Sequence, residues 1–188
     1  MKKLVVFICI FLISACTPYT LVKSEKTDLN GLSVVPSGSW SALSSMLSVE
    51  NIPTWTADGS LLNSIMFFGP ISNEQKLIKG SDQTNYPEFR KDMLPSEVVE
   101  IVESTVTQLY GATILENGTL KPFKINNEPG FQFGFKFAGQ DEVPRGLLAT
   151  GIIKNDMLYI VLYQAANLHF YDKDLANVQR MMASISII

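Results

Sequence analysis

Hydrophobic positions along the chain follow two different periods. In residues 131–137, phenylalanine occupies every second position, which is typical of a β-strand with one wholly aromatic face. In residues 98–109, apolar side chains recur every three or four positions and predict an amphipathic helix. Pro95 and Glu97 suit the first turn of this helix, and Gly111 suits its end. One face of this helix is therefore expected to pack against a sheet.

A second helix is expected near the C-terminus. Asp172 is placed to cap its start, because an aspartate side chain can accept a hydrogen bond from the free backbone N–H groups of a first turn. The apolar residues that follow recur at helical spacing and are Leu175, Val178, Met182 and Ile185.

Other segments have the apolar content of strands, separated by turn residues. Residues 61–68 carry apolar side chains at both parities and predict a strand that is buried on both faces. Asp58-Gly59 and Asn117-Gly118 favour tight hairpin turns, because such dipeptides adopt positive φ angles at little cost. A third hairpin is expected around residues 154–156. By contrast, residues 69–95 show little periodicity and predict an unusually long connection.

The order of these elements is strands, one helix, several strands and one helix. Such an order leaves few parallel crossovers, so the expected fold class is α+β, a mainly antiparallel sheet with two principal helices packed on it. The 188 residues suffice for one domain with a substantial core. This single domain is expected to span residues 31–188.

The first 15 residues have the pattern of an export signal peptide. Lys2 and Lys3 give a positive start, residues 4–13 are almost entirely apolar, and Ser14-Ala15 supplies small residues before a cleavage point. A helix of ten apolar residues is about 15 Å long, roughly half the thickness of the hydrocarbon layer. The run is therefore too short for an ordinary membrane-spanning segment.

Ile13-Ser14-Ala15-Cys16 resembles the processing site of bacterial lipoprotein signal peptides. The resemblance implies cleavage before Cys16 and attachment to its sulfur of lipid that anchors the protein on a membrane. Thr17 is not the aspartate that resembles an inner-membrane retention signal, so the outer membrane, facing the periplasm, is the expected location. Residues 16–30 are expected to comprise the lipidated cysteine and a flexible polar tether.

Charge and cysteine content narrow the possible chemistry. Removal of the signal peptide takes away Lys2 and Lys3, which changes the formal net charge from −3 to −5. The chain therefore lacks the basic footprint of a nucleic-acid-binding protein. Cys9 is lost with the signal and Cys16 is consumed by lipid, so the mature domain has no thiol for a disulfide, a metal site or a nucleophile.

Two further resemblances concern the folded domain. The element order over residues 32–188 resembles the PsbP-like α/β sandwich, which occurs in extrinsic photosystem proteins, some bacterial lipoproteins and nuclear-transport accessory proteins. Residues 55–59 (Trp-Thr-Ala-Asp-Gly) and residues 89–97 resemble segments of uncharacterised proteobacterial lipoproteins. Neither resemblance implies catalytic residues or a cofactor.

His169 is the sole histidine, so metal sites that need two imidazoles are excluded, and no metal or cofactor is expected. A serine–histidine–aspartate arrangement with Asp172 is conceivable, although the chain has no Gly-x-Ser-x-Gly elbow. A packed or hydrogen-bonded histidine is the simpler expectation. Phosphate-binding glycine motifs are also absent from the sequence.

Three functions remain, in order of preference. The first is a lipid-anchored, non-catalytic module of the cell envelope that binds or helps to assemble another protein. Its expected contact residues are Tyr86, Phe89 and Arg90 in the long connection, because tyrosine and arginine favour interfaces. The second is a binder of a small apolar ligand or lipid, in a pocket beside the phenylalanine strand. For the phenylalanine rings themselves, burial beneath a helix is the preferred expectation. The third is a hydrolase that uses His169.

Overall fold

The structure is a computed structural model that describes residues 18–80 and 85–188. The predicted signal peptide and Cys16 lie outside the described residues. The elements are β1 (Tyr19–Leu21), β2 (Thr27–Leu29), β3 (Leu32–Val34), β4 (Ser41–Leu43), the short 3-10 helix η1 (Val49–Asn51), β5 (Thr54–Thr56), β6 (Asn63–Ile71), α2 (Pro95–Tyr110), β7 (Thr113–Asn117), β8 (Lys121–Ile125), β9 (Glu128–Ala138), β10 (Pro144–Lys154), β11 (Met157–Ala166), α3 (Phe170–Ser184) and β12 (Ser186–Ile187).

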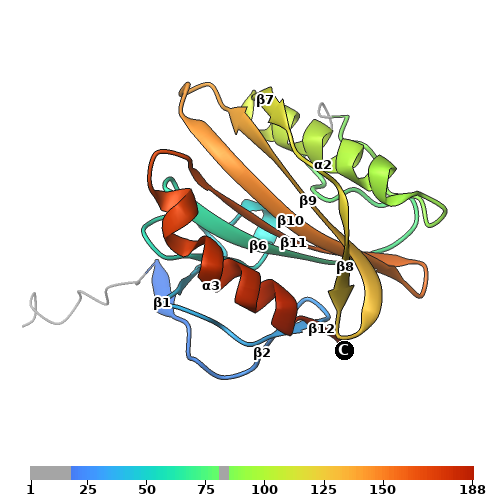
Figure 1. Ribbon diagram of the computed structural model, residues 1–188, viewed down its shortest axis with the longest axis horizontal. Helices are drawn as coiled ribbons and strands as arrows, with labels where there is room; N and C mark the ends of the chain where they lie inside the picture. The colour runs from blue at the N-terminus through green and yellow to red at the C-terminus, as the bar shows by residue number, and fades with distance from the viewer. Residues whose placement is uncertain (1–17, 81–84) are drawn as a thin grey trace, which may run out of the picture.

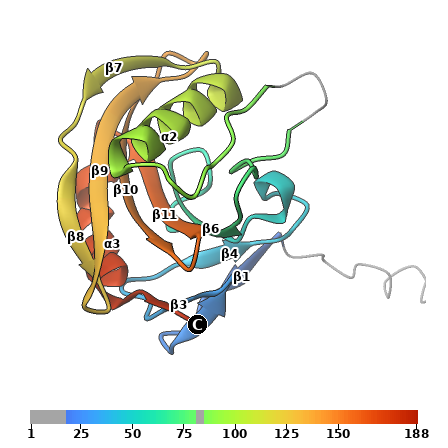
Figure 2. The same ribbon diagram turned by 90° about the vertical axis from the view of Figure 1, so that its right-hand side faces the viewer.

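The described strands form a large antiparallel sheet and a small one. The large sheet has the order β1-β4-β5-β6-β11-β10-β9-β7, and β8 also pairs with β9. The small sheet has the order β12-β3-β2. Figures 1 and 2 show α2 on one face of the large sheet and α3 on the other. The predicted α+β class, with two principal helices packed on a mainly antiparallel sheet, is confirmed.

The central strands bury both of their faces, because each face is covered by a helix. In β11, Leu158 and Leu162 pack in the core on the α2 side, whereas Val161 packs in the core on the α3 side. In β6, Met66 and Phe67 divide between the two cores in the same way. This arrangement explains why these segments are apolar at both parities.

The phenylalanine ladder of β9 is filled core. Its four rings are at most 5% exposed, and they share one hydrophobic cluster with the buried face of α2. The ladder therefore has no pocket between it and the helix, so the preferred expectation of core packing is confirmed and the alternative of a ligand pocket there is wrong. The residues concerned are Phe131, Phe133, Phe135 and Phe137 from β9, and Val98, Ile101, Val102 and Val106 from α2.

The hairpin predicted at Asn117-Gly118 is wrong. β7 and β8 do not pair with each other, because both pair with β9 and form consecutive parts of one sheet edge. Gly118 lies against the backbone of Gly134 in β9, where a side chain on Gly118 would collide with the Gly134 carbonyl oxygen. The true turn is Asn126-Asn127, where both residues have positive φ angles of 48° and 66°. Asparagine tolerates the positive φ angles that such a turn needs, so this turn forms without a glycine.

The start of the second helix is also earlier than predicted. α3 begins at Phe170, so Asp172 lies within the first turn and His169 occupies the cap position. The hydroxyl of Tyr163 donates hydrogen bonds to the carbonyl oxygens of Phe170 and Tyr171, at 2.9 and 3.2 Å. These bonds, with the stacking of Tyr163 on Tyr171, hold the first turn on the sheet. Tertiary contacts therefore fix this helix start in place of an aspartate cap.

Residues 19–29 do not form the flexible tether that their polar composition predicts. β1 pairs with β4, with Tyr19 opposite Leu43, and β2 pairs with β3. The backbone N–H of Ser44 donates to the carbonyl oxygen of Pro18 at 3.0 Å. Backbone pairing at a sheet edge needs few apolar side chains, which is why composition did not indicate it. Residues from Pro18 onward therefore take part in the fold.

The Asp58-Gly59 turn belongs to a wider loop that connects β5 to β6. The carbonyl oxygen of the Asn63 side chain accepts hydrogen bonds from the backbone of Ala57 and the hydroxyl of Thr56. The Asn63 amide nitrogen donates to Asp58 at 2.8 Å and to Asp174 of α3 at 3.1 Å. Burial raises the pKa of Asp174 above its ordinary value. This loop is thus a structural link between the sheet and α3.

Candidate functional site

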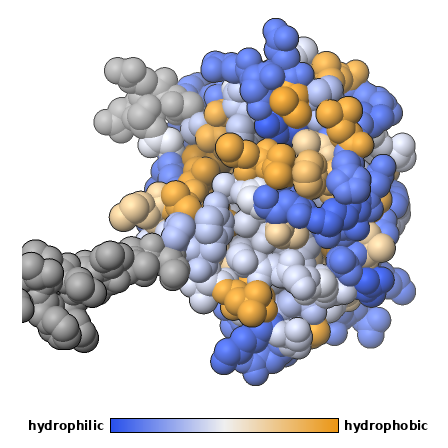
Figure 3. Space-filling model, turned by 90° about the vertical axis from the view of Figure 1, so that its left-hand side faces the viewer, coloured by the Kyte–Doolittle hydropathy of each residue, from blue (hydrophilic) through white to orange (hydrophobic). Residues whose placement is uncertain are grey.

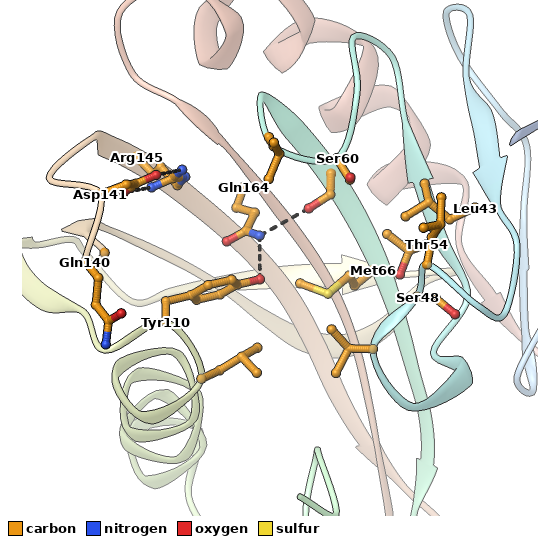
Figure 4. A pocket seen from close by; sticks show the side chains of 16 residues that line it. Leu43, Ser48, Thr54, Ser60, Met66, Tyr110, Gln140, Asp141, Arg145 and Gln164 are labelled. Carbon is orange, nitrogen blue, oxygen red and sulfur yellow. Dashed lines mark hydrogen bonds and ion pairs between the residues drawn. The ribbon is translucent and has the colours of Figure 1, made fainter. Parts of the chain in front are cut away.

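A cleft of about 400 Å³ lies at the C-terminal end of α2 (Figure 4). Its walls come from the end of α2, from β6 and β11, from the connection between β9 and β10, and from residues 43–61. The volume falls within the range of small-molecule sites. Six apolar side chains line it, namely Leu43, Leu47, Val49, Leu61, Met66 and Leu109.

A polar row crosses one side of this apolar lining. The side-chain amide nitrogen of Gln164 donates to the hydroxyl oxygen of Tyr110 at 2.7 Å and to the hydroxyl of Ser64 at 3.2 Å (Figure 4). Gln164 is only 7% exposed, although it stands in an otherwise apolar strand. A buried glutamine is costly unless both ends of its amide are paired.

Only the nitrogen end of the Gln164 amide is paired. Its carbonyl oxygen Oε1 is buried and has no hydrogen-bond partner. Rotating the amide by 180° would let that oxygen accept from Tyr110 and Ser64, and would leave the amide nitrogen without an acceptor instead. In either orientation, Gln164, which lines the cleft, has one buried hydrogen-bonding atom that the protein does not satisfy.

The Tyr110 hydroxyl is kept neutral beside this amide. Desolvation by burial raises the pKa of Tyr110, and the hydrogen bond from Gln164 and the charge of Arg145 only partly oppose that effect. Tyr110 therefore keeps its proton at physiological pH and can donate a hydrogen bond into the cleft.

An ion pair closes the far end of the cleft (Figure 4). The guanidinium of Arg145 binds both carboxylate oxygens of Asp141, with N–O distances of 2.8 and 2.6 Å, and donates to the carbonyl oxygen of Val143 at 3.2 Å. The hydrogen bond from Arg145 lowers the pKa of Asp141 to about 2. These two residues are the charged members of the lining, so the cleft is electrically neutral.

Comparison with known proteins identifies the fold. No protein-family model and no curated protein sequence matches this chain. The solution structure of cyanobacterial PsbP (CyanoP) from Synechocystis sp. PCC 6803 is similar to it, with a TM-score of 0.56 and 12% sequence identity over 94% of this chain and 96% of that one. The chain has a PsbP-like fold.

A second solved structure is more distant from this PsbP-like fold. It is LpqN of Mycobacterium tuberculosis, described as involved in cell envelope biogenesis, which gives a TM-score of 0.36 at 9% identity over 92% of this chain and 87% of that one. The likeness to CyanoP gives the fold alone, because its sequence identity is too low to carry over a function.

Within the PsbP-like fold, two of the three predicted contact residues are buried. Phe89 is 0% exposed and Tyr86 is 6% exposed, and both pack in the hydrophobic core beside α2. The ring of Phe89 therefore serves the core of the domain, whereas Tyr86 also lines an open groove together with Arg90. Arg90 is exposed, and its guanidinium pairs with Glu97 at 3.0 Å and with Asp92 at 3.6 Å.

His169 lies on the surface at the start of α3, with its ring edge-on to Phe170. Among the described residues, its ring makes no hydrogen bond to a serine or a carboxylate, so the geometry of a nucleophilic triad is not assembled there. The same part of the chain contains no group of three histidine, cysteine, aspartate or glutamate side chains arranged to hold a metal ion.

The residues that form the cleft were not identified from the sequence. Tyr110 and Gln164 are more than fifty positions apart, and only the fold brings them together. One signal was present, since Gln164 is the one polar side chain in the apolar run of residues 160–166 apart from the hydroxyl of Tyr163. A polar residue within a buried strand requires a partner, and that requirement pointed to a site.

Proposed function

We propose that the chain is a lipid-anchored protein of the bacterial cell envelope that acts by binding, as an accessory or assembly module. The observation that carries this proposal is the order of features at the N-terminus: positive residues, an apolar run, two small residues and then Cys16. The PsbP-like fold supports it only in supplying a compact domain directly after that cysteine.

The described fold starts very close to the proposed anchor. Two peptide units separate Cys16 from Pro18, so their Cα atoms lie within about 8 Å of each other. Because Pro18 is hydrogen-bonded to Ser44, lipid on Cys16 would hold the β1–β4 edge of the sheet at the membrane surface. Within residues 18–80 and 85–188, no helix combines the length and the apolar character needed to cross a bilayer.

Metabolic labelling with a palmitate analogue tests the anchor. We expect the wild-type protein to incorporate the label and to sediment with membranes, because two or more fatty chains give stable anchoring. Cys16→Ala should lose both properties, whereas Cys9→Ala is the matched control and should keep both, since Cys9 leaves with the signal peptide. A Cys16→Ala protein that still sediments with membranes would refute the proposal.

The outer membrane is the proposed location, because Thr17 follows the cysteine where a retention signal would have aspartate. Density-gradient separation of the two membranes should recover the wild-type protein with the outer one. Thr17→Asp should move it toward the inner membrane if the host reads this signal. Wild-type protein in the inner-membrane fraction would show the location to be wrong.

Binding, in place of catalysis, is proposed because His169 stands alone on the surface and the cleft carries no nucleophile paired with a base among the described residues. A broad esterase and peptidase screen addresses this point directly. Hydrolysis by the wild-type protein that is lost in His169→Ala would overturn it. Crosslinking in intact cells, compared between wild type and Arg90→Glu, would report whether the exposed Arg90 contacts a protein partner.

A further inference from the structure

We propose that the cleft beside Tyr110 and Gln164 binds one amphiphile from the adjacent membrane, with the apolar chain along the leucine and methionine walls and an uncharged hydrogen-bonding group at Gln164. This inference rests on the proposed membrane anchor, and it extends that proposal by naming a ligand class.

The position of the cleft places its apolar end near the proposed anchor. Leu43 lines the cleft and is the direct partner of Tyr19 in the β1–β4 pairing. Ser44, the next residue, is hydrogen-bonded to Pro18. The apolar end of the cleft therefore lies beside the segment that leads to Cys16, and anchoring there would bring that end next to the bilayer.

The opening of the cleft is bordered by exposed apolar side chains. Leu47 and Leu61 line the cleft, yet they are 46% and 83% exposed, and the neighbouring Met46 is 87% exposed. Figure 3 shows apolar surface gathered in a band across this face of the molecule. Large exposed apolar side chains around a concave site are typical of surfaces that meet lipid or apolar ligands. They would provide an apolar path from the bilayer into the cleft.

The inner end of the cleft offers hydrogen-bonding groups from Gln164 and Tyr110. Gln164 lines the cleft, is more than nine-tenths buried and has one amide atom without a hydrogen-bond partner, which a turn of the side chain would present to a ligand. The neutral Tyr110 hydroxyl beside it can donate a hydrogen bond. A ligand group that both donates and accepts, such as a primary amide, would satisfy Gln164 and Tyr110 in either orientation of the glutamine amide.

The charge balance of the cleft favours an uncharged ligand group. The Arg145 guanidinium is already bound by both oxygens of Asp141, so the cleft offers no unpaired cation to a carboxylate or phosphate. A charged group buried there would lose its hydration without gaining a counter-ion. An uncharged polar group avoids this cost. With that group at Gln164, the apolar chain would point toward Leu43 and hence toward the membrane, as it does in a lipid leaflet.

The experiment uses the full-length lipidated protein in phosphatidylcholine vesicles that contain a palmitamide with a diazirine on the part of the chain next to the amide. We expect saturable photolabelling that maps to the peptides containing Met66 or Leu109. Unlabelled palmitamide should compete about tenfold better than hexadecane or palmitate, because one hydrogen bond to a buried group is worth about 1.4 kcal/mol, a factor of ten in affinity. Equal competition by all three molecules, or labelling spread over the surface, would overturn the proposal.

Two variants isolate the two ends of the cleft. Gln164→Leu should lower palmitamide labelling about tenfold, whereas Gln132→Leu, a buried glutamine on the α3 side of the sheet, should leave the labelling of the folded protein unchanged. Leu61→Asp alters an exposed residue, so the domain should still fold, and uptake from vesicles should fall. Labelling that is unchanged in both Gln164→Leu and Leu61→Asp would place the ligand elsewhere and refute the cleft.

Failure of the anchor and failure of the cleft give different results. Sedimentation with the vesicles reports the anchor, and the mapped position of the photolabel reports the cleft. A protein that sediments but is not labelled in the cleft would retain its proposed anchor and lose the proposed ligand. A protein that is labelled at Met66 but does not sediment would retain a ligand site and lose the membrane as its source.

Discussion

The side of the sheet that faces α2 contains two very different regions. Beneath the body of the helix, the phenylalanine ladder of β9 fills all the space and leaves its rings at most 5% exposed. Beyond the end of the helix, Tyr110 and Gln164 border a cleft of about 400 Å³. One region stabilises the domain through packing, and the other contains buried polar groups at the proposed ligand site. Stability and the proposed binding are thus assigned to different parts of a single helix–sheet interface.

The largest expected effect is in the ladder. Phe133→Ala should lower the free energy of unfolding by about 3–5 kcal/mol, because it leaves a cavity in a closely packed core. Leu109→Ala, at the wall of the cleft, should cost clearly less, since Leu109 already borders open space. Urea denaturation of both variants measures the difference. Equal losses would mean that the cleft wall is packed as tightly as the ladder.

The space around backbone glycines should also differ between strand β9 and the cleft. A Cβ atom on Gly134 would lie 2.5 Å from the Leu147 carbonyl oxygen, so Gly134→Ala should destabilise the protein by about 1–3 kcal/mol through overpacking. A Cβ atom on Gly139, at the lip of the cleft, would meet its nearest neighbours at 3.4 Å. Gly139→Ala is therefore the matched control and should cost much less in the same denaturation assay.

A smaller effect is expected for the polar row. Gln164→Leu should change the free energy of unfolding by no more than about 1 kcal/mol, because the lost hydrogen bonds are offset by removal of an unpaired amide atom. Gln132→Leu should cost more, since it removes the amide that donates to the buried hydroxyl of Thr150 on the α3 side and leaves that hydroxyl only the sulfur of Met182. A loss of several kcal/mol in Gln164→Leu would show that the polar row is chiefly structural.

The smallest effect concerns pH. The pKa of Asp174 is raised by burial, so its contribution to stability is present below its unfolded pKa of about 3.8 and is lost as the pH rises through the folded value. The side-chain amide introduced by Asp174→Asn cannot ionise, so this variant should lack that decline in unfolding free energy. Urea midpoints measured from about pH 3 to about pH 8 test this expectation.

Asp141 at the cleft should behave in the opposite way. Its pKa is lowered to about 2, so the pairing with Arg145 contributes above the unfolded pKa and is lost as the pH falls toward 2. Asp141→Asn should therefore weaken the acid-side rise in stability. The same pH dependence in both variants would contradict the assignment of one carboxyl to burial and the other to an ion pair.

The sequence predicted most of the large elements because their signals are local. Alternating phenylalanines indicated β9, three- and four-residue spacing indicated α2, and the turn between β10 and β11 follows from Asn155-Asp156, both with positive φ. These patterns report which face of a segment is buried, and burial decides the element. The order of elements then sufficed for the fold class.

Features that depend on distant partners were not predictable in this way. The break between β7 and β8 looks like a hairpin turn until Gly118 is seen against Gly134. Phe89 looks like a contact residue in a polar loop, yet that loop folds its ring into the core. The cleft is assembled from five separate parts of the chain, so no local spacing encodes it.

The hydrogen bond between Ser44 and Pro18 bears on how the protein would encounter its ligand. If Cys16 carries lipid as proposed, a domain held this closely to it could not tumble far from the bilayer, and the search for a lipid would take place in two dimensions. The effective concentration of the cleft at the leaflet would then be set by geometry and would not fall as the protein is diluted. Weak intrinsic affinity for a single lipid would be enough to keep such a site occupied.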